Sequence, residues 1–404
     1  MRAFGLFGLL MSLTLFAGSP TAALAQAPEP EDRTAAIEAA QAERAQNLYP
    51  YVPDRSERVM TRFENVFVYP TTTWHPFLES AYSGGGFAPG AGYMRHLTAY
   101  SSLDVRGSYS IKNYKRIEAE FVSPRLFNRR GHLSVLGGWR DATQVGFYGF
   151  GMNTSKDNRA NYGFEQPYGS ALLTVRPTRE FLLLRGGFEL SRWALKSGTG
   201  GIQSVDEVFT PATLPGLETR TTYLHTQATV GFDWRTSSGY TRRGGFYGVT
   251  AHDYSDRDDQ FGFRRVAYEA IQHIPILRES WVISLHGLMQ NTWRKGDQQV
   301  PFFMTPSLGG GSSLRGFSSW RFRDNDSLLM QAEWRIPVNR YLDTAVFYDS
   351  GMVAERTSDL NINGLKHDYG FGARFHTPFS TVLRIDVARS NEGTSLVFAT
   401  SPVF

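Results

Sequence analysis

The chain has 404 residues and a formal net charge of +4, from 42 Lys and Arg against 38 Asp and Glu. Its aromatic content of 14% excludes a disordered chain, and its lack of cysteine excludes disulfides, thiolate metal sites and cysteine nucleophiles. After the first 20 residues no segment approaches the roughly 18 uncharged apolar residues of a membrane-spanning helix, and no polybasic block typical of nucleic-acid binding is present.

Residues 1–25 have the layout of a secretory signal peptide. Arg2 supplies the positive charge, and residues 3–18 are apolar but too few to anchor the chain as a spanning helix. Residues 23–25 (Ala-Leu-Ala) place small side chains at the cleavage positions. We therefore expect export and removal of residues 1–25.

Residues 26–73 are expected to form a short N-terminal periplasmic segment. Residues 26–33 are polar and Pro-rich, as in a flexible leader. Residues 34–48 are rich in Ala and Glu, and Thr34 can cap a helix there. Because its apolar face is sparse, this stretch predicts a marginal helix.

From residue 74 to the end, segments of about ten residues alternate apolar and polar side chains. In residues 328–336, Met330 and Trp334 lie on one face, and Gln331 and Glu333 lie on the other. A period of two indicates strands. The same alternation is found in residues 117–121, 182–190, 281–290, 368–376 and 381–388.

Two all-β architectures alternate in this way, a soluble sandwich and a transmembrane barrel whose apolar side chains face lipid. The barrel is favoured because aromatic residues lie near segment ends and the polar faces mix opposite charges that can pair in a lumen. Phe404 also follows Leu396 and Phe398 on one face, which resembles the C-terminal signal of bacterial outer-membrane proteins. Pro402 departs from that pattern, because it removes a backbone donor from the last strand.

We therefore predict a transmembrane antiparallel β-barrel over residues 74–404, with sixteen strands, an even number that suits closure. Long loops are expected at 197–219 and 295–325, and the usual rule places them outside. The expected strands cover residues 76–85, 90–99, 101–112, 115–123, 131–141, 160–175, 180–195, 220–235, 243–255, 259–274, 280–293, 327–337, 342–353, 367–376, 380–389 and 395–404.

One motif lies in the second of these loops, where residues 307–317 are SLGGGSSLRGF, and QAEWRIP (331–337) and VFYDSG (346–351) follow. Together with the closing segments GFGARFHTPF and LRIDVA, these motifs resemble the outer-membrane assembly-factor superfamily, also called the bacterial surface antigen family, whose barrels include BamA and TamA. The match covers roughly residues 300–404. The resemblance implies a loop-anchor motif at Leu314, Arg315, Gly316 and Phe317, with Glu333 and Asp349 on the next two strands.

The residues themselves support a loop folded into the lumen. Gly309, Gly310 and Gly311 allow a sharp turn, because glycine adopts positive φ freely. Inside the lumen, the Arg315 guanidinium requires partners.

Glu333 and Asp349 lie on polar faces of the following strands and can accept its hydrogen bonds. From the pattern alone, two alternatives stay open: a solvated Arg315, and a Glu333 that is satisfied by Arg335. With the resemblance, a pinned loop is expected.

The resemblance also implies POTRA domains before the barrel, but residues 26–73 are too few for one. Client delivery is then expected from a separate periplasmic protein, or residues 26–73 plug the lumen.

We expect no enzyme activity, cofactor or metal, because the nine His are dispersed and GGSSL (310–314) is not a G-x-S-x-G nucleophile motif.

We therefore expect a barrel in the outer membrane that inserts or translocates client polypeptides. Its first and last strands are expected to meet at a weak seam, because Ser83 to Gly86 is Gly-rich and Pro402 reduces pairing. The alternatives are a passive diffusion channel, and a scaffold for a periplasmic partner or for lipid handling. Expected partners are outer-membrane lipid and clients, and not nucleic acid.

Overall fold

The computed structural model describes residues 33–46, 52–63, 65–66, 73–178, 181–277 and 280–404. The expected signal peptide lies outside the described residues. The chain divides into two compact units, Met1–Asp54 and Arg55–Phe404. In the first unit, α1 (Arg33–Gln46) occupies most of the Ala/Glu-rich stretch.

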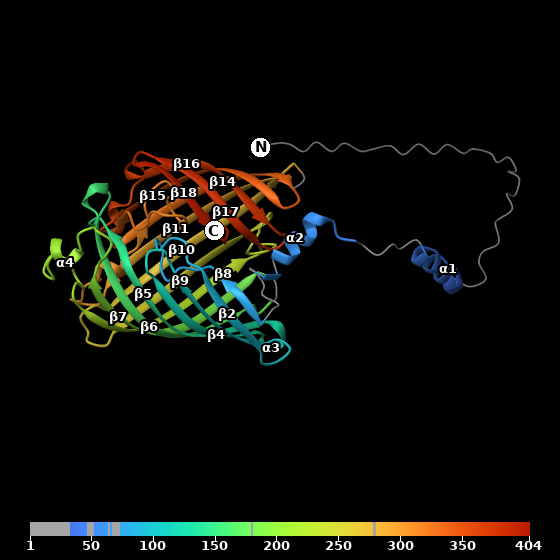
Figure 1. Ribbon diagram of the computed structural model, residues 1–404, viewed down its shortest axis with the longest axis horizontal. Helices are drawn as coiled ribbons and strands as arrows, with labels where there is room; N and C mark the ends of the chain where they lie inside the picture. Colours follow the sequence, from blue (N-terminus) through green and yellow to red (C-terminus); the bar gives the residue numbers. More distant parts are fainter. Residues whose placement is uncertain (1–32, 47–51, 64, 67–72, 179–180, 278–279) are drawn as a thin grey trace, which may run out of the picture. The chain divides into compact units, whose positions relative to one another are not determined.

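The second unit contains a sixteen-stranded antiparallel sheet whose strands follow chain order (Figure 1). The prediction of an all-β fold with sixteen strands is therefore confirmed. The strands are β1 (Trp74–Phe77), β2 (Gly90–His96), β3 (Ser102–Tyr109), β4 (Lys115–Arg125), β5 (Gly131–Phe147), β6 (Ala160–Val175), β7 (Leu182–Ser197), β8 (Arg220–Asp233), β9 (Gly244–Asp256), β10 (Phe263–Ile276), β11 (Trp281–Arg294), β14 (Asp326–Asn339), β15 (Leu342–Ala354), β16 (Lys366–His376), β17 (Thr381–Ser390) and β18 (Gly393–Ala399).

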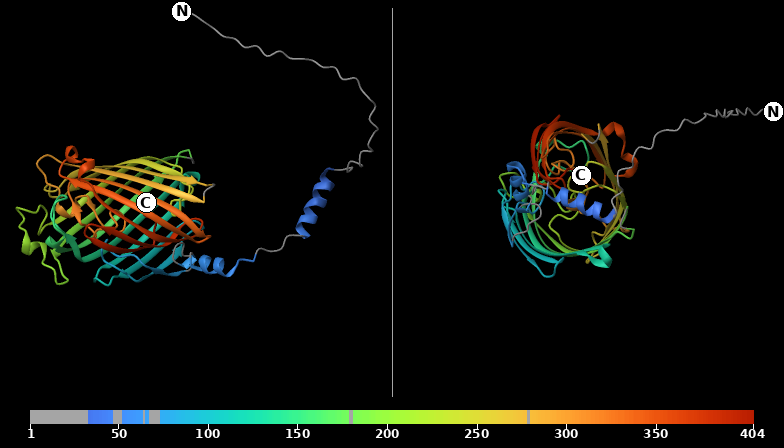
Figure 2. Two further views of the ribbon diagram at one scale, coloured as in Figure 1. Left: turned by 90° about the horizontal axis from the view of Figure 1, so that it is seen from above. Right: turned by 90° about the vertical axis from the view of Figure 1, so that its right-hand side faces the viewer.

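The sheet curls into a barrel around a lumen that holds loop segments (Figure 2). The connections that precede β3, β5, β7, β9, β11, β15 and β17 lie at one end, here called the short-turn end. The opposite, long-loop end carries residues 198–219 and 295–325. Within residues 295–325, β12 (Ser307–Leu308) pairs with β13 (Phe322–Arg323).

The remaining elements are short helices. Helix α2 (Arg55–Phe63) precedes β1, and Glu57 in it pairs with Arg340 in the β14–β15 turn at 3.4 Å. Among the helices of the described residues, none is long and apolar enough to cross a membrane. The others are α3 (Leu126–Arg129), η2 (Lys156–Asn158), α4 (Val205–Val208), η3 (Phe302–Met304), η4 (Thr357–Asp359) and η5 (Ile362–Gly364).

Through most of the wall, the apolar face of each strand points outward and the polar face inward. Met330 and Trp334 are exposed on the outer face of β14, whereas Gln331 and Glu333 between them are buried. This inverted pattern is expected of a wall with lipid outside and polar groups inside.

The lumen is not polar throughout, contrary to the sequence prediction. Strands β5 and β6 have 17 and 16 residues, more than the roughly 9–11 needed to cross a bilayer. At the long-loop end both faces of β5 and β6 are largely buried, because residues 198–219 and 295–306 pack against their ends. This cluster includes Phe147, Tyr162, Phe164, Trp193, Leu214, Phe302 and Phe303.

The two edge strands are shorter than predicted. Strand β1 ends at Phe77, so Ser83 to Gly86 lies beyond it, where Gly84 and Gly86 adopt φ of 89° and 76°. Strand β18 ends at Ala399, so Pro402 also lies outside the ladder. The described part of β1 pairs with β2, and that of β18 with β17.

Candidate functional site

The loop between β11 and β14 turns back into the lumen at its glycines. Gly309 and Gly310 have φ of 116° and 95°, a region that side chains strongly disfavour. Gly311 is required for space, because a Cβ there would lie 2.7 Å from a methyl carbon of Val397 on β18. The predicted hinge residues therefore bring the loop directly against the barrel wall.

The Arg315 side chain lies at the centre of the lumen network and is 0% exposed. Its Nε and Nη2 donate to the two carboxylate oxygens of Asp349 at 2.6 and 2.7 Å. Its Nη1 donates to Glu333 at 3.0 Å and to Asp386 at 3.4 Å. The guanidinium also lies over the Phe347 ring, 3.4 Å from its centroid. This geometry is the two-pronged arrangement that matches guanidinium to carboxylate.

Two further arginines complete the network. Arg374 on β16 pairs with Glu333 at 2.6 Å and also with Asp386. Arg384 on β17 donates to Asp386 at 3.1 Å and to the Gly311 carbonyl at 2.7 Å. Three guanidiniums thus pair with three carboxylates in a buried site, and a fourth buried acidic residue, Asp368, lies opposite Asp349 in register.

The other three motif residues fix the loop by packing. Leu314 and Phe317 are buried in an apolar cluster inside the barrel. Gly316 approaches the wall so closely that a Cβ would lie 2.6 Å from the Cβ of Asp368 and 3.0 Å from that of Ser390. The Gly316 carbonyl accepts a hydrogen bond from the Ser390 hydroxyl at 2.8 Å.

The structure therefore brings together every residue of the predicted anchor. The structure does not support the alternative in which Arg335 forms the ion pair with Glu333. Arg335 donates instead to the Thr241 carbonyl and to Ser284.

Sequence reasoning missed Arg374, Arg384 and Asp386 as members of the network. All three occupy polar-face positions of segments whose alternation was recognised, so their inward direction could be predicted. Which inward charges meet depends on how strands β14 to β17 curve around the loop.

Beyond the motif, the loop contacts segments next to both edge strands. Trp320 donates from its ring nitrogen to the Ser83 carbonyl at 2.9 Å and stacks on Tyr82 at a centroid distance of 4.6 Å. The adjacent Arg321 pairs with Glu392, in the β17–β18 turn, at 2.8 Å. One dipeptide therefore bridges the segment after β1 and the turn before β18.

At the short-turn end, residues 234–243, here called the strap, reach from the β8–β9 connection to the β16–β17 turn. Gly239 forms a parallel bridge with Ser380, although β10, β11, β14 and β15 separate β9 from β16. The Tyr240 hydroxyl donates to Asp343 of β15 at 2.6 Å. Burial raises the pKa of Tyr240. The strap therefore crosses part of the lumen.

The sequence pattern predicts Phe404 on the same outer face as Leu396 and Phe398, but the structure places it elsewhere. Leu396 and Phe398 are 60% and 63% exposed on that face. After Ala399 the chain leaves the ladder, and the Phe404 ring lies 4.9 Å from the ring of His286, an inward-facing residue of β11. The predicted face is wrong, because the strand ends before Phe404.

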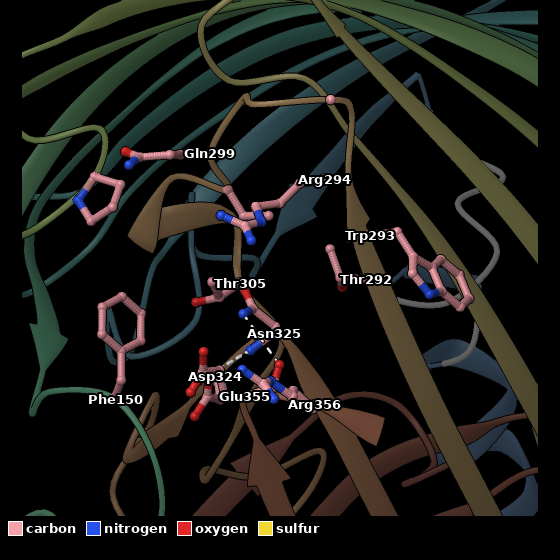
Figure 3. A pocket seen from close by; sticks show the side chains of 13 residues that line it. Phe150, Thr292, Trp293, Arg294, Gln299, Thr305, Asp324, Asn325, Glu355 and Arg356 are labelled. Atoms are coloured by element: carbon pink, nitrogen blue, oxygen red, sulfur yellow. Dashed lines mark hydrogen bonds between the residues drawn. The ribbon is translucent and has the colours of Figure 1, made fainter. Parts of the chain in front are cut away.

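A separate cavity of about 680 Å³ lies at the long-loop end (Figure 3). Its lining combines Arg294 and Arg356 with Asp324 and Glu355, and burial raises the pKa of Asp324. The described residues include no group of three or more His, Asp or Glu with metal-binding geometry. None of the predicted anchor residues lines this cavity.

Comparison with protein families matches residues 101–398 to the Omp85 superfamily domain. No curated protein sequence matches the chain.

Among solved structures, the chain is similar to BamA from Haemophilus ducreyi lacking POTRA domains 1–3, with a TM-score of 0.57 and 17% identity, over 78% of this chain and 67% of that one. It is also similar to CdiB from Escherichia coli, with a TM-score of 0.51 and 11% identity, over 78% of this chain and 57% of that one. At these identities the likeness shows the fold. The chain spans about two thirds or less of these structures.

Proposed function

Because this chain belongs to the Omp85 superfamily, we propose that it helps to insert or translocate polypeptides at the outer membrane. The family resemblance predicted from the sequence is confirmed by the match over residues 101–398. Members of this superfamily are barrels of the outer membrane. The particular activity and the clients are part of the proposal.

The observation that carries the proposal is the occupied lumen. The loop is held by the Arg315 contacts to Asp349 and Glu333, all of them buried. The strap crosses the same lumen at the short-turn end. A path through a permanently open lumen is therefore disfavoured, which argues against the passive channel.

The proposed route lies at the seam between β1 and β18. Strand β1 has four residues and β18 has seven, so this junction has few ladder hydrogen bonds to offer. Unpaired backbone N–H and C=O groups at a strand edge raise the free energy of the barrel in lipid unless another strand pairs with them. A client strand that adds to this edge would satisfy those groups while it enters the membrane.

A disulfide lock tests the seam directly, because the chain has no cysteine of its own. Trp74→Cys on the outer face of β1 would be combined with Leu396→Cys or Phe398→Cys on β18. The oxidised barrel would be reconstituted in vesicles, and the folding rate of an added, unfolded outer-membrane barrel would be measured. We expect the lock to abolish acceleration and reduction to restore it.

The matched control is a disulfide between two neighbouring strands away from the seam. Tyr93 on β2 and Val105 on β3 are paired in register and both are exposed. Locking Tyr93→Cys to Val105→Cys should leave acceleration unchanged. Equal acceleration by the seam-locked barrel would overturn the proposed route.

We also propose that a separate periplasmic protein delivers the clients. Purification of the barrel from native membranes, without prior stripping by urea, would recover such a protein in a stable ratio. Its absence from repeated preparations, while clients are still inserted, would contradict this part of the proposal.

A further inference from the structure

A groove of about 610 Å³ lies on the outer wall, over strands β9 to β16. Small residues on three strands form its floor: Ala270 on β10, Gly287 on β11 and Ala332 on β14. Ala270 and Gly287 are directly paired. A Cβ built on Gly287 would meet no atom within 4 Å, so the wall is hollow at this point.

The groove faces the membrane and is largely apolar. Leu285, Met330 and Tyr348 line it and are exposed on the lipid-facing side of their strands. It extends from Tyr247, near the short-turn end of β9, to His367, near the long-loop end of β16. These end residues belong to one row of directly paired residues that crosses six strands. Because barrel strands are tilted, this row rises obliquely from the short-turn end toward the long-loop end.

One end of the groove contains an unsatisfied polar group. Ser350 pairs with Met330 and His367 in register, which places it on the outward face of β15. It is nevertheless only 4% exposed, and its hydroxyl has no hydrogen-bond partner in the described part of the chain. A buried hydroxyl in apolar surroundings loses free energy unless an acceptor reaches it.

We propose that this groove binds one ester-linked acyl chain of a membrane phospholipid, and that the ester carbonyl accepts a hydrogen bond from Ser350 Oγ. The membrane around the barrel supplies hydrocarbon chains at this surface. The methylene groups bury apolar area over Ala270, Gly287 and Ala332. At this end of the groove Tyr348 and His367 hydrogen-bond to each other, whereas the Ser350 hydroxyl lacks a partner in the described part of the chain. The Ser350 hydroxyl therefore fixes where the head of the lipid begins, which selects a chain bearing an acceptor at its end.

The test is native mass spectrometry of the full barrel mixed with palmitoyl-oleoyl phosphatidylethanolamine in detergent. The wild-type barrel should retain one such lipid. Gly287→Leu fills the groove and should lower retention by about tenfold, as expected when about two methylene groups lose their contacts. Ser350→Ala should lower retention by roughly fivefold, because it removes one hydrogen bond.

Gly186→Leu is the matched control. Gly186 lies on β7, two residues from the exposed Leu184 and Phe188, and a Cβ there would also meet no atom within 4 Å. It adds the same side chain to the lipid-facing wall outside the groove, so retention should equal that of the wild type. A heat-modifiable gel shift would verify that each variant is folded.

Three outcomes would overturn the proposal. The first is a wild-type barrel that retains no lipid. The second is equal retention by the Gly287→Leu and Gly186→Leu variants. The third is retention of lipopolysaccharide in place of the phospholipid when both are offered, because that result assigns the groove to another occupant.

Discussion

Among the loop residues, Arg315 is the one whose replacement should lower the free energy of unfolding most. Replacing it with Ala leaves Asp349 and Glu333 buried with fewer partners, although Arg374 still pairs with Glu333. Removing one partner from a buried ion pair typically lowers the free energy of unfolding by about 3–5 kcal/mol. We expect a loss of this size for Arg315→Ala, measured as the urea dependence of the heat-modifiable gel shift.

The control for this measurement is Arg294→Ala. Arg294 is exposed at the rim of the long-loop cavity, in the same half of the chain. Its replacement should change the urea midpoint little, because exposed arginines contribute little to stability. Equal midpoints for the two variants would show that the anchor does not stabilise the barrel.

A charge swap should distinguish the two carboxylates. Arg315→Glu is expected to loosen the fold, because it replaces the central cation of the network with another carboxylate. Adding Asp349→Arg should restore more stability than adding Glu333→Arg, because Asp349 receives two of the Arg315 hydrogen bonds while Glu333 is also needed by Arg374. The urea midpoints of the two double variants provide the comparison, and equal or reversed rescue would contradict this ranking.

Sequence reasoning could identify Arg315, Glu333 and Asp349 because each stands in a motif with a fixed spacing. Arg384 and Asp386 carry no such motif. Alternation gives the face on which a side chain lies, but contacts across the lumen depend on barrel curvature and on the path of the loop. The full set of ion pairs among the three arginines and three carboxylates can therefore be identified only from the structure.

Among the elements, the long loop has a second role at its far end, where it bridges the seam. Arg321 pairs with Glu392 beside β18, and Trp320 contacts Ser83 after β1. We expect Arg321→Ala to release the β17–β18 turn, because Arg321 also donates to the Thr154 hydroxyl and carbonyl from a buried position. Hydrogen–deuterium exchange over residues 389–395 should become faster.

Lys156→Ala is the control for that experiment. Lys156 donates only its side-chain ammonium to the Glu392 carbonyl, at 3.1 Å and in an exposed position. Its loss should leave exchange over residues 389–395 nearly unchanged, because exposed contacts of this kind contribute little. If Arg321→Ala also leaves exchange unchanged, the bridge does not restrain the seam.

The strands were predictable because their period of two continues from residue 74 to the end, and each of the sixteen expected segments overlaps a strand, although the first shares only residues 76–77 with β1. Their ends were less predictable. Residues 78–85 leave the ladder at a turn with positive φ at Gly84, and strand β5 continues to Phe147 because loops cover its end. The alternation of apolar and polar residues within a strand does not reveal the contacts with loops and turns that determine where the strand ends.

For the whole molecule, the lumen is obstructed at two levels by different parts of the chain. The anchored loop occupies the level of Arg315, and the strap crosses near Tyr240 and Gly239. A variant that loosens only one of them should still conduct poorly. This property separates the proposed assembly factor from a passive channel, whose lumen is open by design.

Conductance in planar bilayers measures this difference. We expect small, unsteady currents from the wild type and from Arg315→Ala, because in both the strap still crosses part of the lumen at the short-turn end. Replacing residues 237–241 with a shorter glycine-serine turn should have little effect alone, because the anchored loop remains. Combined with Arg315→Ala, it should produce a large and steady conductance. A wild-type barrel that already conducts strongly, with currents unaffected by either change, would instead identify a diffusion channel.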